Sequence, residues 1–221
     1  MRLQTFIISI CVVASAASAQ AESFTTSEAY RQCAALAMQT PASAEKKAKS
    51  LLQTEKSAGN YHCLAMAYYN TGRFEEAARL LAGVRALLPE TDLRLRAYVL
   101  RQEARAWSEA GKPDAARQAL SQVIDRAPMD AIHVPELGTL LGELLLDRAQ
   151  LWVDAGRNAE AMQDLDHAIA LNGTPTDYFI ARAKLYTLLG DTALAKADLQ
   201  QVLRVNPSHA EAVALMRELR E

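Results

Sequence analysis

The 221-residue sequence is poor in the residue types that mark enzymes and metal sites. Its three cysteines and four histidines are scattered along the chain, without the spacing of zinc ligands on a helix. The motifs G-x-S-x-G, C-x-x-C and H-E-x-x-H are all absent. We therefore expect no enzymatic activity, no cofactor and no metal ion.

Neither sign of charge is in large excess, with 24 Lys and Arg against 26 Asp and Glu. Loss of Arg2 with the N-terminal segment would leave 23 against 26, a net charge of −3. This balance does not favour nucleic acid or an anionic membrane as a partner. Beyond the N-terminal segment, no apolar run reaches the roughly 20 residues that a membrane span requires.

Residues 1–21 have the layout of a secretory signal peptide, because Arg2 precedes an apolar run over residues 6–13 and then small residues. Cleavage after Ala19 and cleavage after Ala21 both fit the small-residue pattern, and we favour Ala21. Retention as an uncleaved anchor is the alternative. We expect a mature chain that is periplasmic or secreted.

One pattern recurs four times in the remaining chain. An aromatic residue is followed by glycine four positions later, and alanine and leucine stand five and nine positions after the glycine. The aromatics are Tyr68, Trp107, Trp152 and Tyr186. The glycines are Gly72, Gly111, Gly156 and Gly190. The alanines are Ala77, Ala116, Ala161 and Ala195, the leucines are Leu81, Leu120, Leu165 and Leu199, and a further alanine stands seven residues before each glycine.

This pattern resembles the tetratricopeptide repeat, a helix–turn–helix unit of 34 residues. The resemblance covers Ala58 to Pro207 and implies an all-α, right-handed superhelix. It divides the chain into four units, 58–91, 97–130, 142–175 and 176–207. A degenerate helix pair precedes them in 22–57, and a closing helix follows in 208–221. In this reading the alanines, glycines and aromatics serve helix packing and helix ends.

Two helix details follow from the sequence. Additional residues before the third and fourth units lengthen the first helices of those units, and we expect one long helix over 136–154. Ser208 and Glu211 have the spacing of a capping box, which predicts that the closing helix begins at Ser208.

Several positions that are commonly apolar in this family carry charge here. Arg148 and Arg182 each have an aspartate sixteen residues later, Asp164 and Asp198, and the resemblance implies that each pair lies on facing helices of one unit. We interpret both as structural ion pairs. Glu103 fills the equivalent position of the third unit, but its opposite residue is alanine, so its partner must come from elsewhere, such as a neighbouring arginine.

Cys33 and Cys63 remain after the signal peptide is removed, and an even count in an exported chain favours a disulfide. A metal site that includes His62 is the alternative. The resemblance implies that the two cysteines lie in first helices of successive units, which are neighbours in this family.

In the family, side chains of the first helices line an inner groove that binds peptides or proteins. The corresponding residues here are His62, Met66, Tyr69 and Asn70 in the second unit, Tyr98, Arg101 and Arg105 in the third, Glu143 and Gln150 in the fourth, and Lys184 in the fifth. Arg101 and Arg105 lie one helical turn apart and are expected to hold a carboxylate or an acidic segment between Tyr69 and Tyr98.

These observations lead to two hypotheses. The first is a periplasmic scaffold that binds a protein or peptide in its concave groove during envelope assembly or secretion. The second is a structural subunit that assembles into an envelope complex through its convex face or its ends. A polar and aromatic groove favours the first, whereas an apolar patch at one end favours the second.

Overall fold

The computed structural model describes residues 27–126, 135–172 and 176–219, so the signal-peptide prediction lies outside the described residues. Within these ranges all regular structure is α-helical. The helices are α1 (Glu28–Gln39), α2 (Pro41–Thr54), α3 (Ala58–Asn70), α4 (Phe74–Leu87), α5 (Leu93–Glu109), α6 (Pro113–Ile124), α7 (Pro135–Asp154), α8 (Asn158–Asn172), α9 (Thr176–Leu188), α10 (Thr192–Val205) and α11 (Ala210–Glu218). The all-α prediction is confirmed.

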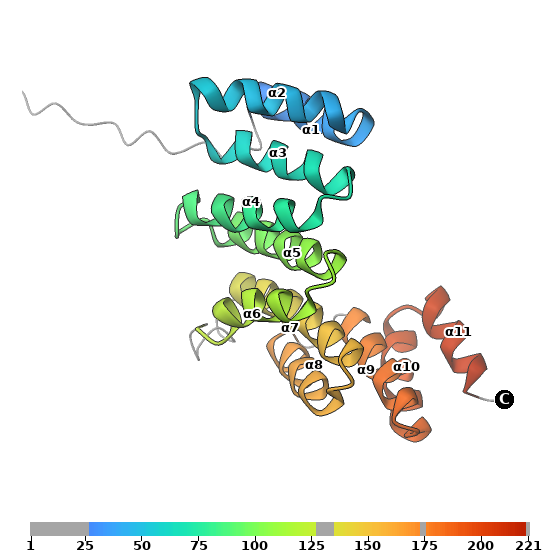
Figure 1. Cartoon of the computed structure of the whole chain (residues 1–221). Coiled ribbons are helices and arrows are strands. Elements are labelled where there is room, and N and C mark those ends of the chain that lie inside the picture. The colour runs from blue at the N-terminus through green and yellow to red at the C-terminus, as the bar shows by residue number, and fades with distance from the viewer. Residues whose placement is uncertain (1–26, 127–134, 173–175, 220–221) are drawn as a thin grey trace, which may run out of the picture.

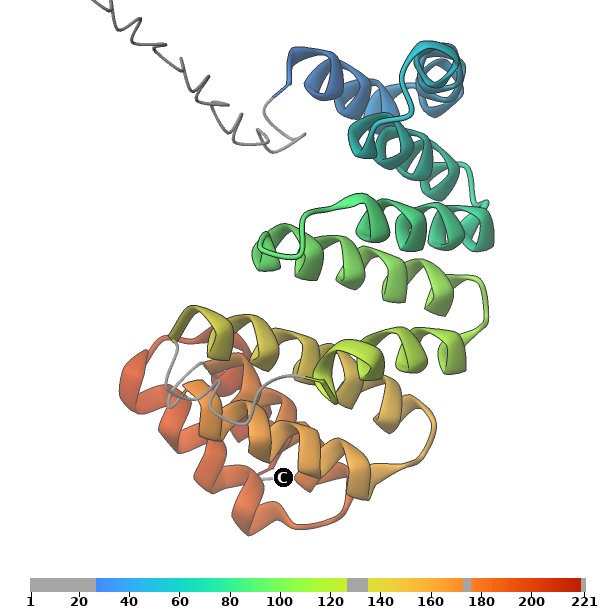
Figure 2. The same ribbon diagram turned by 90° about the vertical axis from the view of Figure 1, so that its left-hand side faces the viewer.

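The helices form an elongated stack in chain order, with α1 and α2 at one end and α11 at the other (Figures 1 and 2). Helices that follow one another in sequence pack together, and α1, α5 and α7 also contact the first helix of the next unit. The stack changes direction near α7, so that α8 to α11 lie to one side of the stack formed by α1 to α6 (Figure 1). This arrangement leaves the first helices side by side along one face.

Each of the four repeated glycines makes the turn between the two helices of its unit. Their φ angles are 78° at Gly72, 70° at Gly111, 70° at Gly156 and 83° at Gly190. At Gly72 the chain reverses so that the Arg73 N–H donates to the Tyr68 carbonyl at 2.9 Å, which closes the end of α3. A side chain would strain this left-handed backbone, so the predicted helix ends are explained by the glycines.

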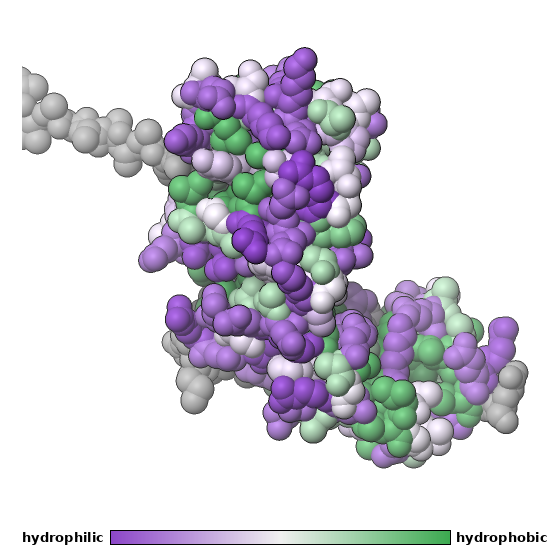
Figure 3. Space-filling model, viewed as in Figure 1, coloured by the Kyte–Doolittle hydropathy of each residue, from purple (hydrophilic) through white to green (hydrophobic). Residues whose placement is uncertain are grey.

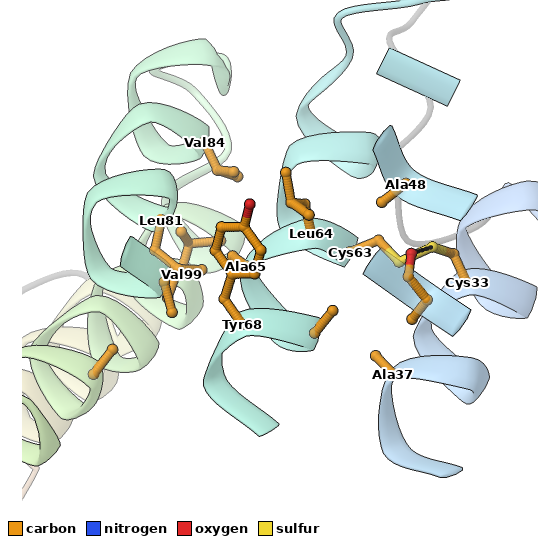
Figure 4. Close-up of a cluster of buried hydrophobic side chains, with 14 of the residues drawn as sticks. Cys33, Ala37, Ala48, Cys63, Leu64, Ala65, Tyr68, Leu81, Val84 and Val99 are labelled. Atoms are coloured by element: carbon orange, nitrogen blue, oxygen red, sulfur yellow. Dashed lines mark hydrogen bonds between the residues drawn. A yellow bond between two sulfur atoms is a disulfide. The ribbon is translucent and has the colours of Figure 1, made fainter. Parts of the chain in front are cut away.

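The repeated alanines and leucines are buried, as the packing interpretation predicts. Ala65 and Ala77 are fully buried, and their small size lets α3 and α4 approach closely. Tyr68 fills the space beside them, near Leu81 (Figure 4). The guanidinium of Arg73 covers the outer face of the Tyr68 ring at 3.7 Å from its centroid.

The long first helices are present, since α5 begins at Leu93 and α7 at Pro135. The capping-box prediction is wrong. Ser208 lies one residue before the N-cap position, and its hydroxyl donates to the Asn206 side-chain oxygen at 3.0 Å. Instead His209 is the N-cap residue of α11, and its ring nitrogen accepts from the Ala212 N–H at 3.5 Å.

The predicted ion pairs between facing helices are present. Arg148 binds Asp164 through two hydrogen bonds of 2.8 and 2.7 Å. Arg182 binds Asp198 in the same way, with both bonds at 2.8 Å. These forked contacts place each buried aspartate against a cation, as burial of a carboxylate requires.

Glu103 is also buried, and its partner is an arginine from outside its own unit, as the sequence suggested. The Arg85 Nε donates to a Glu103 carboxylate oxygen at 3.0 Å, so this pair joins α4 to α5. Arg148 similarly extends back to the preceding helix, where it bonds to Asp125 at 2.9 Å. The buried charges therefore also bind successive units together.

The two mature cysteines are joined in the structure, with Cys33 of α1 and Cys63 of α3 forming a disulfide across a Cα–Cα distance of 5.9 Å (Figure 4). Both residues are buried. The Asn70 side chain makes a second link between the same helices, because its Nδ2 donates to the Ala37 carbonyl at 2.8 Å. The degenerate first unit is thereby attached to the second.

Candidate partner-binding groove

A chain of connected cavities follows the first helices. A cavity of about 310 Å³ lies among α1, α3 and α5, one of about 550 Å³ lies between α5 and α7, and one of about 490 Å³ lies between α7 and α9. Arg105 lines the first two, and Asp147 and Gln150 line the second and third. Because neighbouring cavities share walls, we call this continuous feature the groove.

The first cavity combines apolar and aromatic walls with one cation. Its lining residues are Met38, Ala65, Met66, Tyr69, Asn70, Leu81, Gln102 and Arg105. Met38 exposes 70% of its surface here, although the thioether side chain is well suited to apolar contacts. Met66, Tyr69 and Asn70, which the sequence assigned to the groove, are thus brought together with Arg105.

Arg105 is exposed and, among the described residues, has no ion-pair partner. Its guanidinium lies over the Tyr69 ring, 5.5 Å from the centroid. A guanidinium packed on an aromatic face keeps its N–H groups at its edge, where they can bind a carboxylate. This contact supports the predicted role of Arg105 and gives Tyr69 a part in orienting it.

Arg101 differs from the expected arrangement, because its guanidinium forms ion pairs within the protein. Its Nε donates to Asp147 at 2.6 Å and another guanidinium nitrogen donates to Glu143 at 2.9 Å, both on α7. The hydrogen bond with Asp147 raises the pKa of Arg101. Arg101 therefore bridges α5 and α7 instead of presenting a free guanidinium beside Arg105. The sequence could not reveal this, because the partners are more than forty residues away.

His62 lies beneath the groove and is not part of its surface, because it is fully buried. Its Nδ1 lies 3.0 Å from the Tyr30 hydroxyl, and its Nε2 lies 2.6 Å from the Gln102 side-chain oxygen. Burial lowers the pKa of His62 and raises that of Tyr30 to about 12. The expectation that His62 contacts a partner is corrected, since residues of α1 and α5 cover it.

The tyrosine expected on the third unit is at the surface. Tyr98 exposes half of its area and lines both the 550 Å³ cavity and a 400 Å³ cavity toward the start of α5 and α7. A tyrosine ring in such a position offers a flat apolar face together with a hydroxyl. It remains available to a bound segment.

The remaining predicted residues lie toward the far end of the groove. Gln150 is exposed, and its amide donates to Asp154 at 2.9 Å. Lys184 lines the 490 Å³ cavity, but its ammonium group lies 2.6 Å from Glu211 of the closing helix. Two aspartates that the sequence analysis did not select, Asp154 in the 550 Å³ cavity and Asp177 in the 490 Å³ cavity, have no cationic partner among the described residues.

Metal-binding clusters and membrane-spanning helices are absent from the part of the chain that the structure describes. No group of three or more histidine, cysteine, aspartate or glutamate side chains is arranged there to hold a metal ion. Within the same ranges, no helix combines the length and apolar character needed to cross a membrane.

Two family models described as tetratricopeptide repeat match residues 98–128 and 176–209. No curated protein matches the sequence. The first stretch lies within the unit 97–130, and the second covers the unit 176–207 and two further residues.

Three solved structures illustrate the similarity of fold. The chain is 17% identical to the Pseudomonas aeruginosa protein PilF, with a TM-score of 0.56 over 86% of this chain and 80% of that one. For YrrB, described as a TPR protein with an unusual peptide-binding site, the identity is 13% and the TM-score 0.58, over 86% and 90%. For MamA from Desulfovibrio magneticus RS-1 they are 16% and 0.55, over 83% and 98%. At these identities the likeness establishes the solenoid fold alone.

Proposed function

We propose that this chain, a tetratricopeptide repeat protein, is a scaffold that binds an extended segment of a partner protein in the groove of its first helices. The segment carries a carboxylate, from an acidic residue or a chain end, which binds Arg105. An adjoining apolar side chain occupies the cavity beside Met66 and Tyr69. Tyr98 and Gln150 contact the segment farther along the groove.

The observation that carries this proposal is the position of Arg105. It stands at the junction of two cavities, is held over the Tyr69 ring, and lacks a carboxylate among the described residues. Most other arginines near the groove or the unit junctions, such as Arg101 and Arg148, are paired within the protein. An aromatic-supported cation beside an apolar cavity suits a carboxylate-bearing segment.

We further propose that the protein acts outside the cytoplasm, in the periplasm or after secretion, in envelope assembly or secretion of other proteins. The signal-like segment 1–21 supports this location. The disulfide supports it as well, because such bonds persist in oxidising compartments. Fusion of residues 1–30 to alkaline phosphatase tests it, since that reporter is active only after export.

The role is non-catalytic in this proposal. The groove contains aromatic, basic and acidic side chains, but the described residues include no nucleophile positioned by a base and an orienting acid. The fold of stacked helix pairs is suited to binding extended segments. The second hypothesis is a structural subunit that assembles through one end, and exposed leucines in the last unit are the observation in its favour.

A binding measurement tests the main proposal. The mature chain, used as bait in a periplasmic extract, would provide a partner, and its dissociation constant would be measured by isothermal titration calorimetry. We expect Arg105→Ala to weaken binding by about 2 kcal/mol, roughly thirtyfold, as loss of a charge-assisted contact does. Arg79→Ala removes an exposed arginine from α4, away from the groove, and is the matched control. Equal dissociation constants for the two variants and the wild type would exclude this assignment.

A further inference from the structure

The corner between α9 and α10 exposes three leucines. Leu188 is the last residue of α9, Leu189 follows it in the turn, and Leu194 lies in the first turn of α10. Their exposed fractions are 62%, 52% and 45%. Figure 3 shows hydrophobic side chains gathered where α9 meets α10, in a surface that is otherwise largely hydrophilic around it. We call these three residues the leucine corner.

The other units show that this corner does not need leucine. The three leucines stand two and one residues before the turn glycine and four residues after it. The equivalent residues of the three preceding units are polar or small. These residues are Asn70, Thr71 and Glu76 in the second unit, Glu109, Ala110 and Ala115 in the third, and Asp154, Ala155 and Glu160 in the fourth. The backbone turn is the same in each unit, with a glycine at positive φ. Packing of the turn therefore does not account for the leucines.

The leucine corner is continuous with the groove. Leu188 also lines the 490 Å³ cavity between α7 and α9, together with Val153 and Ala181. Apolar side chains from the corner and from the groove thus form one surface. A segment that lies in the groove and leaves it at α9 would pass over these leucines.

One unpaired charge beside this surface has the opposite sign to Arg105. Asp177 lines the same cavity as Leu188, whereas Asp154 lines the 550 Å³ cavity together with Arg105. Asp177 has no cationic partner among the described residues. The lysine of this cavity, Lys184, is paired with Glu211. A ligand for this end must therefore be complementary to apolar and negative surface.

We propose that the leucine corner and the adjoining α7–α9 cavity dock a partner segment in which bulky apolar side chains stand next to a lysine or arginine. The inference rests on the proposed function for the existence of a protein partner. It adds an orientation for the bound segment along the groove. The carboxylate of the segment binds near Arg105, and its basic, apolar part binds near Leu188. From α5 to α9 is two helix spacings, about 20 Å, which roughly six extended residues span.

A second copy of the chain fits this surface less well. The three leucines expose roughly 300 Å² in total, within the range of the largest patch on an ordinary monomer. A stable interface between two proteins buries about 800 Å² on each side. The corner alone is too small for a dimer, but it suits one or two side chains of a bound segment.

The test uses a phage-displayed library of random twelve-residue peptides, selected on the mature chain. We expect enriched peptides to place leucine, isoleucine, phenylalanine or methionine beside lysine or arginine. Their synthetic versions should bind at least tenfold more weakly to the triple variant Leu188→Asn, Leu189→Thr and Leu194→Glu, which carries the residues of the second unit. Leu87→Asn alters an equally exposed leucine on α4 and should leave binding unchanged.

The triple variant separates apolar from electrostatic attraction. Leu194→Glu adds a negative charge, so it would strengthen a purely electrostatic contact with a basic peptide. Enrichment of acidic peptides, equal binding by the triple variant, or no enrichment would overturn the inference. If the wild type sediments as a dimer and the triple variant as a monomer, the leucine corner is an interface with a second copy. That result would also overturn the inference. Peptides that bind the triple variant but no longer bind Arg105→Ala would support the proposed function of the groove and would exclude the leucine corner as a docking site.

Discussion

Arg101 of α5 holds Asp147 of α7 by two hydrogen bonds, from Nε at 2.6 Å and from a terminal nitrogen at 3.2 Å. The contact crosses from the third unit to the fourth along the floor of the groove. It distinguishes two arginines that lie one turn apart on the same helix. Arg101 has a structural role at the unit junction, whereas Arg105 is available to a ligand.

Arg101→Gln should therefore change stability more than Arg105→Gln does. The groups of the Arg101 pair are 42% and 30% exposed, so solvent screens the interaction, and we expect a loss of about 0.5–1 kcal/mol in the free energy of unfolding. Urea denaturation followed by circular dichroism measures the difference. Raising the salt concentration should reduce it. Identical unfolding midpoints for the two variants would contradict the structural role of Arg101.

The Cys33–Cys63 disulfide should be formed in the mature protein and should stabilise it. It closes a loop of 30 residues, for which chain-entropy reasoning gives about 3–4 kcal/mol. We expect no free thiol when the mature, unreduced chain is unfolded and titrated with a thiol reagent. The double variant Cys33→Ala and Cys63→Ala should unfold at lower urea concentration, beginning in α1 and α2. Two titratable thiols per chain would show that the bond is absent.

The Arg85–Glu103 pair should be costly to break. Glu103 is almost fully buried, and Arg85→Ala would leave its carboxylate without a cation. Loss of one partner of a buried pair typically lowers the free energy of unfolding by about 3–5 kcal/mol. Replacement of both residues, Arg85→Met with Glu103→Leu, should be much less destabilising. If Arg85→Ala is as stable as the double variant, the cost of burying the Glu103 carboxylate without Arg85 is offset by another group.

His62 should make stability depend on pH. Burial lowers its pKa below the ordinary value of 6.5, so the unfolded chain binds the proton more readily than the folded one. The contribution of neutral His62 is complete above pH 6.5 and is lost as the pH falls below it toward the folded-state pKa. Melting temperatures of wild type and His62→Gln, measured from pH 7.5 to pH 5, should converge at the acidic end. Parallel curves would mean that His62 is not a source of the dependence.

The local regularities were available from the sequence. The fixed spacing of aromatic, glycine, alanine and leucine predicted helix pairs, because only glycine suits the positive φ at each corner and small residues suit close helix packing. The same register predicted the Arg148–Asp164 and Arg182–Asp198 pairs, whose members belong to one unit. Contacts within a repeat follow from the repeat, since each unit reproduces the same geometry.

Apart from the Cys33–Cys63 disulfide and an arginine partner for Glu103, the contacts between units were decided only by the tertiary structure. A register within each unit places His62 and Arg101 on the face of the groove, but it does not say which residues of neighbouring helices reach them. In the structure Tyr30 and Gln102 cover His62, and Asp147 binds Arg101. The leucine corner is likewise visible as sequence, but its exposure depends on the fold around it. Burial and ion pairing between units depend on how the units stack. That stacking is determined jointly by side chains that lie far apart in the chain.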